Sequence, residues 1–223
     1  MIEANKRLGF KRLFYLYQKY HLIRKHFSTV SITGDIDEKT EVPTIYIANH
    51  SSWWDGLLIF QLTERFSKND HYIMMNESGL NEYRFFQKLG AYSVNRDQPK
   101  DVVRSLLYTQ DLIAQGKKIW LFPQGAIEHP QAPLQFQKGI GYLIQQFEKA
   151  AVKPVTFHYY HYEHPKTIGA IDVGAAKLIN TTQSKLDIAK DCEALLQAQR
   201  DKQVKALIDK PDAPFDAPYM SLR

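Results

Sequence analysis

Residues 44–55 read Thr-Ile-Tyr-Ile-Ala-Asn-His-Ser-Ser-Trp-Trp-Asp, an apolar run that gives way to polar side chains. The run Thr44–Ala48 is rich in β-branched and aromatic residues and predicts a strand. After it, four residues separate His50 from Asp55. A general base needs a group that accepts a proton near neutral pH and a partner that fixes its tautomer. His50 can supply the first and Asp55 the second if the chain turns between them, although a histidine close to an aspartate is more often structural than catalytic.

Strand-like and helical patterns alternate along the rest of the chain. The strand-like runs are residues 71–75, 91–95, 118–122, 154–160 and 167–173. The helical patterns are residues 56–66, 81–89, 99–115, 139–150 and 183–210. Strands that alternate with helices of this length predict an α/β fold with a largely parallel central sheet flanked by helices.

Chemistry in such sheets gathers in the loops beyond the carboxyl ends of the strands. Three loops qualify: one holds His50 and Asp55, a second holds Arg96, and a third reads Pro123-Gln-Gly-Ala126. A base, a cation and a glycine loop would together suit a polar, anionic substrate. The interpretation rests on their joint placement, because an isolated arginine or a single Pro-Gln-Gly turn is usually an ordinary surface feature.

The positive charge of the chain is concentrated at its N-terminus. Residues 1–27 contain seven Lys or Arg and one Glu, whereas the whole chain has a net charge of +5. The i, i+3, i+4 spacing of an amphipathic helix is followed by Phe10, Leu13, Phe14, Tyr17 and Tyr20. Such a basic helix predicts docking on an anionic membrane surface. An ordinary helix packed on the core is an equally good interpretation, and nucleic-acid binding is disfavoured because no nucleic-acid module is recognisable.

The length of 223 residues is sufficient for one sizeable domain. We expect this domain to cover residues 28–210, preceded by the basic helix of residues 1–27 and followed by a surface tail, residues 211–223. No apolar run approaches the roughly 18 residues that would predict a membrane-spanning helix. No secretory signal is recognisable in residues 1–10, which are charged and precede no apolar segment.

Neither cysteine nor histidine usage predicts a metal centre. The single cysteine, Cys192, excludes a disulfide framework and is expected to be buried on the apolar side of the last helix. His158, His161 and His164 invite a metal interpretation, but residues three apart on a strand point to opposite faces. We therefore expect no bound metal.

Four blocks of the sequence resemble the lysophospholipid, or glycerolipid, acyltransferase family. The family's hallmark His-x4-Asp is matched by residues 50–55, with Asn49 before it and Gly56 after it. The remaining blocks, a glycine-led strand closing on arginine, a Phe-Pro-Glu-Gly loop and a Val-Pro-type strand, are similar to residues 90–96, 122–125 and 152–155. Because the blocks keep the family's order and spacing between Thr44 and Phe157, the resemblance is specific.

The resemblance implies an enzyme that moves a fatty acyl group from acyl-CoA or acyl carrier protein to a hydroxyl of a lysophospholipid such as 1-acylglycerol-3-phosphate. His50 would be the general base and Asp55 would orient it, with no cofactor besides the thioester co-substrate. The expected location is the cytoplasmic face of a membrane, as a peripheral protein. The residues expected at the acceptor are Arg96, Gln124 and Gly125, and those that could line a channel are Trp53 and Trp54. Lys138 could touch donor phosphates, although a solvated lysine is the more common case.

The chain departs from the family pattern in its third block. Gln124 stands where the family usually has glutamate, and Ala126-Ile127 replaces the usual Thr-Arg. A carboxamide can donate as well as accept hydrogen bonds, and the lost arginine removes a phosphate partner. A glycolipid or carotenoid-glycoside acceptor is therefore an alternative with the same chemistry. A catalytically silent protein that binds membrane lipid is an alternative of another class.

Overall fold

The computed structural model describes residues 1–216 and 218–222, which contain a single nine-stranded sheet. The strands are β1 (Phe27–Thr33), β2 (Thr44–Ala48), β3 (His71–Asn76), β4 (Ala91–Val94), β5 (Lys118–Leu121), β6 (Ala150–Tyr160), β7 (Thr167–Val173), β8 (Lys177–Ile179) and β9 (Met220–Ser221). Their order is β4-β3-β5-β2-β6-β7-β1-β9, and β8 pairs with β6. The five strands from β4 to β6 in this order are parallel, which confirms the predicted α/β fold. Beyond them, β7 runs antiparallel to β6, and β1 lies parallel to β7.

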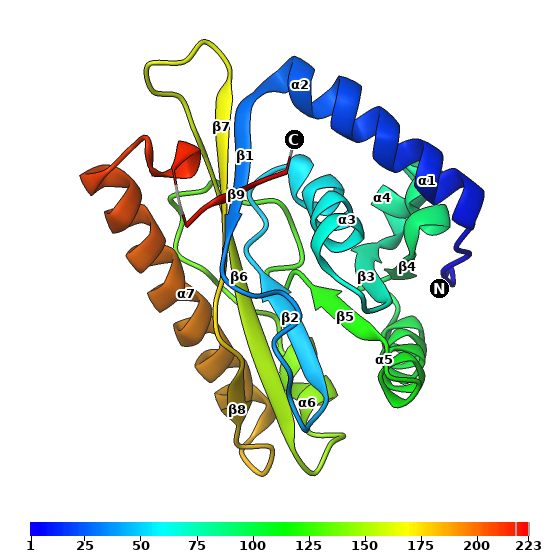
Figure 1. Ribbon diagram of the computed structural model, residues 1–223. Coiled ribbons are helices and arrows are strands. Elements are labelled where there is room, and N and C mark those ends of the chain that lie inside the picture. Colours follow the sequence, from blue (N-terminus) through cyan, green and yellow to red (C-terminus); the bar gives the residue numbers. More distant parts are fainter. Residues whose placement is uncertain (217, 223) are drawn as a thin grey trace.

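Helices cover both faces of the sheet (Figure 1). On one face lie α1 (Leu8–Tyr17), a π-helical turn (Gln18–Leu22), α2 (Ile23–His26) and α3 (Trp54–Phe66). On the other face lie α5 (Pro99–Ala114), α6 (Gly139–Ile144) and the long α7 (Lys185–Asp209). Two short helices, α4 (Glu77–Glu82) and a 3-10 helix (Arg84–Leu89), pack near the edge formed by β3 and β4.

Alternate residues of the central strands serve two separate cores. In β2, Ile45 and Ile47 pack with α5, α6 and α7, whereas Tyr46 packs with α3. In the neighbouring β5, Ile119 joins the first core and Trp120 the second. Burial on both faces explains why the strand-like runs are almost continuously apolar instead of alternating with polar residues.

The predicted elements differ from the structure mainly at their ends. The predicted helix over residues 139–150 is wrong in its second half, because α6 ends at Ile144 and Ala150 already belongs to β6. The pairing of Ala150 and Ala151 with β8 holds these residues extended. The predicted helix over residues 81–89 is divided at Tyr83, whose backbone is not helical. Strand β1 has no counterpart among the predicted strands.

The C-terminal tail is anchored to the sheet instead of lying free on the surface. Residues 220–221 form β9 and pair with β1, and Leu222 is fully buried in the core beside α3. A 3-10 turn (Ala213–Phe215) precedes this strand. Ala217 and Arg223, which belong to the predicted tail, lie outside the described residues.

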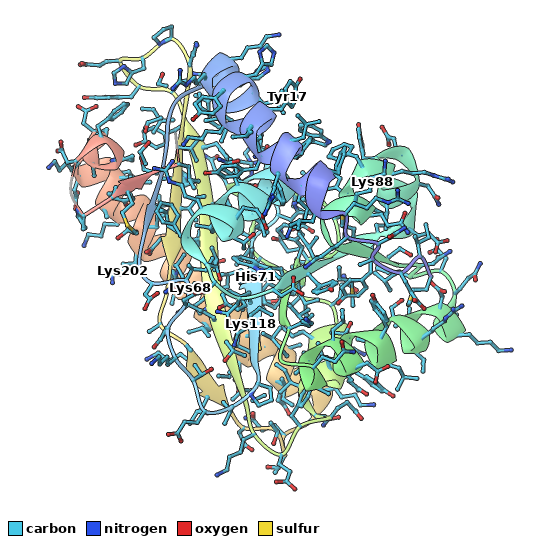
Figure 2. All side chains as sticks on the ribbon, turned by 45° about the vertical axis from the view of Figure 1, so that its right-hand side comes forward. Tyr17, Lys68, His71, Lys88, Lys118 and Lys202 are labelled. Atoms are coloured by element: carbon cyan, nitrogen blue, oxygen red, sulfur yellow. The ribbon has the colours of Figure 1, made fainter. Side chains whose placement is uncertain are left out.

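The predicted N-terminal helix forms a continuous helical segment from Leu8 to His26. Its inner side carries Phe10 and Phe14, which pack in the cluster with α3, and the fully buried Ile23. The predicted apolar stripe is therefore divided: Leu13, Tyr17 and Tyr20 face outward and are 48–68% exposed. Figure 2 shows Tyr17 on this helix, at the periphery of the molecule. None of the helices in the described part of the chain combines the length and apolar character needed to cross a bilayer.

Candidate active site

The three predicted loops meet at one edge of the sheet. His50 follows β2, residues 122–125 follow β5, and Arg96 lies just beyond β4. Since β2 pairs with β5, and β3 joins β5 to β4, their carboxyl ends open on the same side. The parallel arrangement thus brings together residues that are about 75 positions apart in the sequence.

His50 and Asp55 form a hydrogen-bonded pair, with 2.8 Å between His50 Nδ1 and Asp55 Oδ2. The same carboxylate oxygen accepts the backbone N–H groups of Ser51 at 2.8 Å and Ser52 at 2.9 Å. The chain turns between the two residues as expected, and Asp55 occupies the first turn of α3, where the helix dipole favours a negative charge. Asp55 is fully buried, whereas the His50 side chain is 20% exposed.

The hydrogen bonds of Asp55 determine the tautomer of His50. Oδ2 already accepts two amide N–H groups, so in the hydrogen bond with this oxygen Nδ1 of His50 is the donor. In the neutral ring Nε2 then carries the free lone pair. The other carboxylate oxygen, Oδ1, accepts the Tyr159 hydroxyl at 2.6 Å. Burial first, and then the charge of Asp55, raise the pKa of Tyr159 well above its usual value, so its hydroxyl stays protonated and donates.

A ring contact and two hydrogen bonds join the His50 loop to the loop after β5, and a third hydrogen bond braces the latter loop. The imidazole stacks on Phe122 with 4.0 Å between ring centres and 10° between planes. The His50 N–H donates to Gln124 Oε1 at 2.8 Å, and Gln124 Nε2 donates to Glu128 Oε2 at 2.7 Å. The N–H of Glu128 donates back to the His50 carbonyl at 2.9 Å. These contacts fix the position of His50 relative to the glycine loop.

Gln124 does not lie where a residue that contacts the acceptor substrate was expected. Its side chain is 4% exposed and is not among the residues that line the neighbouring cavity. Both ends of its amide bind protein groups, the His50 N–H and the Glu128 carboxylate. Its arrangement is that of a residue that positions His50.

Beside His50 lies a cavity of about 800 Å³, which is within the usual size range of ligand sites. Its lining is mostly apolar and includes Ile73, Met74, Met75, Val94, Val102, Leu106, Leu121, Phe136, Ile140 and Leu186. Polar and charged side chains also line it, among them Arg96, Gln137 and Lys138. The cavity can therefore hold a long apolar group together with an anionic one.

Gly125 and Arg96 lie against each other at this cavity. The backbone of Gly125 has φ +80°, and a Cβ added there would come within 2.3 Å of Arg96 Nη1. The position thus requires glycine both for its backbone conformation and for the close approach of the guanidinium. Arg96 forms no ion pair with any described residue, so its donors are available to a ligand.

The two tryptophans of the hallmark have different surroundings. Trp53 is 42% exposed, lines the cavity and contacts the Tyr83 ring. Trp54 does not line the cavity and packs between His26 and Phe27. Only Trp53 is therefore placed where a channel residue would be.

The metal interpretation gains no support from the described residues. Residues 1–216 and 218–222 contain no group of three or more His, Cys, Asp or Glu side chains arranged to hold a metal ion. His158 lies in β6 with its ring tilted against that of Tyr160, whereas His164 lies beside Phe215. Cys192 is fully buried in the core, as predicted, and burial raises the pKa of its thiol to about 12.

A model of the acyltransferase family matches residues 29–158, more than half of the chain. The chain belongs to the acyltransferase family. The structure of this acyltransferase is also similar to the crystal structure of PlsC, the 1-acyl-sn-glycerophosphate acyltransferase of Thermotoga maritima. The TM-score is 0.59 at 16% sequence identity, over 86% of this chain and 79% of PlsC. No curated protein sequence matches the chain.

Sequence reasoning did not find Tyr159, Glu128 and Phe122 as parts of the site of this acyltransferase. Tyr159 lies 104 residues after Asp55, on a strand whose pattern indicates only burial. Glu128 lies outside the four family blocks, in a loop where spacing along the chain does not predict a contact with Gln124. Phe122 is part of the third block, but its stacking on His50 depends on the pairing of β2 with β5.

Proposed function

We propose that this acyltransferase moves a fatty acyl group from acyl-CoA or acyl carrier protein to a hydroxyl of a lysophospholipid such as 1-acylglycerol-3-phosphate. One observation carries the proposal. The Nδ1 of His50 is held by the buried Asp55 carboxylate, which leaves Nε2 as the free ring nitrogen of a side chain that lines an apolar cavity. The family and the fold, which is shared with PlsC, support the acyl transfer and this class of acceptor.

In the proposed mechanism, His50 Nε2 takes the proton of the acceptor hydroxyl as its oxygen attacks the thioester carbonyl carbon. Asp55 stabilises the imidazolium and keeps the ring in place. When the tetrahedral intermediate collapses, the carbon–sulfur bond breaks, and the thiolate takes the proton from the imidazolium. The products are an ester and a free thiol, and no acyl-enzyme is formed.

The oxyanion of that intermediate needs hydrogen-bond donors near Gly125. The Gly125 N–H already donates to the Phe122 carbonyl at 2.9 Å. The next two amides, those of Ala126 and Ile127, have no partner among the described residues, and both residues line the cavity. These two amides are the better candidates for the oxyanion donors.

Arg96 is the proposed contact for the acceptor phosphate. A guanidinium can bind a phosphate through two parallel hydrogen bonds, and that of Arg96 lines the cavity without an ion-pair partner among the described residues. The apolar lining of the cavity is proposed to hold an acyl chain. Lys138, which lines the same cavity, would add a positive charge near the phosphates of either substrate.

The test follows thiol release from acyl-CoA and from acyl carrier protein, with lysophospholipids, glycolipids and no acceptor as separate arms. His50→Ala should lower the rate by roughly 10²- to 10⁴-fold, and His161→Ala, which replaces an exposed histidine, should leave it unchanged. A rate that is highest with a glycolipid would favour the alternative acceptor. If no donor and acceptor together give His50-dependent thiol release, the enzymatic proposal is wrong.

We also propose that the outward side of the N-terminal helical segment docks on an anionic membrane. Leu13, Leu16, Tyr17 and Tyr20 are exposed there beside exposed basic residues such as Arg12 and Arg24. Apolar and aromatic residues interspersed with positive charges suit the interface of anionic lipid. A lipid acceptor would then reach the enzyme from the membrane surface.

Point changes test the docking better than truncation, because residues 1–27 include Ile23 and Phe27 of the buried core. Leu13→Gln combined with Leu16→Gln should weaken sedimentation with phosphatidylglycerol vesicles. Ile208→Gln is the matched control, since Ile208 is 71% exposed on α7, away from this surface. Equal vesicle binding by the wild type and the double variant would contradict the proposal.

A further inference from the structure

We infer that Tyr159 is a positioning residue for the acyl transfer, which acts on His50 through Asp55. The inference rests on the proposed role of His50 as general base. Tyr159 lies in β6, and its hydroxyl donates to Asp55 Oδ1 at 2.6 Å. It is not among the residues that line the cavity, so it does not contact the substrates directly.

The two oxygens of the Asp55 carboxylate have very different surroundings. Oδ2 has three partners, His50 Nδ1 and the N–H groups of Ser51 and Ser52. Among the described residues, Oδ1 has only the Tyr159 hydroxyl. The Tyr159 hydroxyl therefore completes the solvation of a fully buried negative charge. Without it, Oδ1 would be a buried anionic oxygen with no donor.

The Tyr159 hydroxyl also determines the rotation of the carboxylate. Without this donor the carboxylate is anchored only at Oδ2, by His50 Nδ1 and two amide N–H groups, which allows a rocking motion about that oxygen. The tyrosine resists it because it belongs to a rigid element: its backbone pairs with Gly169 of β7, and its ring contacts Phe27. A group held on a paired strand positions a neighbouring carboxylate more firmly than one on a loop.

The hydrogen bond also sets how strongly Asp55 attracts the protonated His50 ring. A donor on Oδ1 draws part of the negative charge away from Oδ2, the oxygen that faces Nδ1. Loss of the donor should therefore favour the imidazolium, so that His50 holds its proton to higher pH. A purely structural role for Tyr159 would predict no such change.

Tyr159→Phe is the test variant, because it removes only the hydroxyl and keeps the ring in the core. Tyr160→Phe is the matched control: it removes the hydroxyl of the next residue, which donates to the Pro211 carbonyl and makes no contact with Asp55. Successive strand residues point to opposite faces, so the two changes affect different sides of the sheet. Thermal unfolding of both variants checks that the fold is kept.

For Tyr159→Phe we expect kcat to fall by roughly 10- to 100-fold, by analogy with the loss of residues that orient metal-ligating histidines. KM for donor and acceptor should stay within about twofold, since the cavity is unchanged. The acidic limb of the pH–kcat profile should move to higher pH. Tyr160→Phe should match the wild type in all three quantities.

An NMR titration of the His50 ring, assigned by comparison with His50→Ala, tests the inference without any activity. The midpoint should move to higher pH in Tyr159→Phe and stay in place in Tyr160→Phe. Superimposable titration curves for the wild type and Tyr159→Phe would overturn the inference, as would equal losses of kcat in the two variants. A wild type that releases no thiol would overturn the proposed function, and the titration would still decide whether Tyr159 controls His50.

Discussion

Replacing Gln124 by glutamate, the residue usual in the family, should lower both the stability and the activity of this protein. In the structure one end of the Gln124 amide accepts a hydrogen bond and the other end donates one. Oε1 accepts the His50 N–H at 2.8 Å, and Nε2 donates to the Glu128 carboxylate at 2.7 Å. A carboxylate at position 124 could keep the first contact, but its second oxygen would face the Glu128 carboxylate without a proton to share.

The cost can be worked out from these two contacts. The lost hydrogen bond to a charged group is worth about 1.5–3 kcal/mol. Two like charges about 4 Å apart repel by about 4 kcal/mol at the effective dielectric constant of a protein surface. Glu128 is only partly buried and can turn toward solvent, which relieves most of this repulsion. We therefore expect Gln124→Glu to lower the free energy of unfolding by about 2–3 kcal/mol and Tm by about 5–10 °C.

The reciprocal change should reverse the loss. In the double variant Gln124→Glu with Glu128→Gln, the amide at position 128 can donate to the carboxylate at position 124, which still accepts the His50 N–H. The double variant should then lie within about 1 kcal/mol of the wild type. Glu128→Gln alone should cost about 0.5–1 kcal/mol, because it retains a neutral hydrogen bond. Gln135→Glu, an exposed position on the same loop, is the control and should have no measurable effect.

Urea unfolding of the four proteins of this cycle at pH 7 measures the coupling directly. The two single changes should deviate from additivity by about 2 kcal/mol. The four proteins should rank in the same order by kcat, since the amide of Gln124 holds the backbone of His50, the proposed base. Additivity within about 0.5 kcal/mol would show that Gln124 and Glu128 do not act as a pair and would refute this reasoning.

Two further perturbations test the packing of the site and of the sheet. Gly125→Ala should reduce acyl transfer at least tenfold and the free energy of unfolding by about 1–2 kcal/mol, because φ is +80° and the new Cβ would displace the Arg96 guanidinium. Thiol-release rates measure the first effect and circular dichroism melts the second. A fully active variant would contradict this arrangement of Gly125 and Arg96. Burial lowers the pKa of His71 from its ordinary 6.5 to about 3. Between these pH values the unfolded chain binds a proton at His71 and the folded protein does not. The free energy of unfolding should therefore fall as the pH drops below about 6.5, by about 1–2 kcal/mol at pH 5. His71→Gln, which keeps an acceptor for the Trp120 indole, should lose this part of the pH dependence of unfolding, and an unchanged pH dependence would show that His71 is not its source.

The fold could be predicted from local patterns because the strand runs are short, apolar and separated by helices. The predicted bounds of β2 and β7 agree with the structure, and those of β3, β4 and β5 differ by one residue. The predictions were weakest where long-range pairing overrides local preference. Residues 145–150 have a helical pattern, but the pairing of Ala150 with Ile179 ends the helix early. Strand β1 exists as a strand because β7 lies beside it.

The chemical identity of the site was largely determined by the sequence. The spacing of His50 and Asp55 after a strand predicts a base and its orienting acid, and the glycine loop and Arg96 follow neighbouring strands. The placement of charge along the chain is also a property of the sequence. These features are local, or depend only on the rule that parallel strands share one carboxyl edge.

Only the tertiary structure decided which polar groups complete the site. It pairs Asp55 with Tyr159 and gives Gln124 a place between the His50 backbone and Glu128, away from the cavity. It also divides the two tryptophans between cavity and core. The physical reason is distance along the chain: hydrogen bonds between residues 74 or 104 positions apart depend on how strands pair and how their side chains rotate, and neither is encoded in a local pattern.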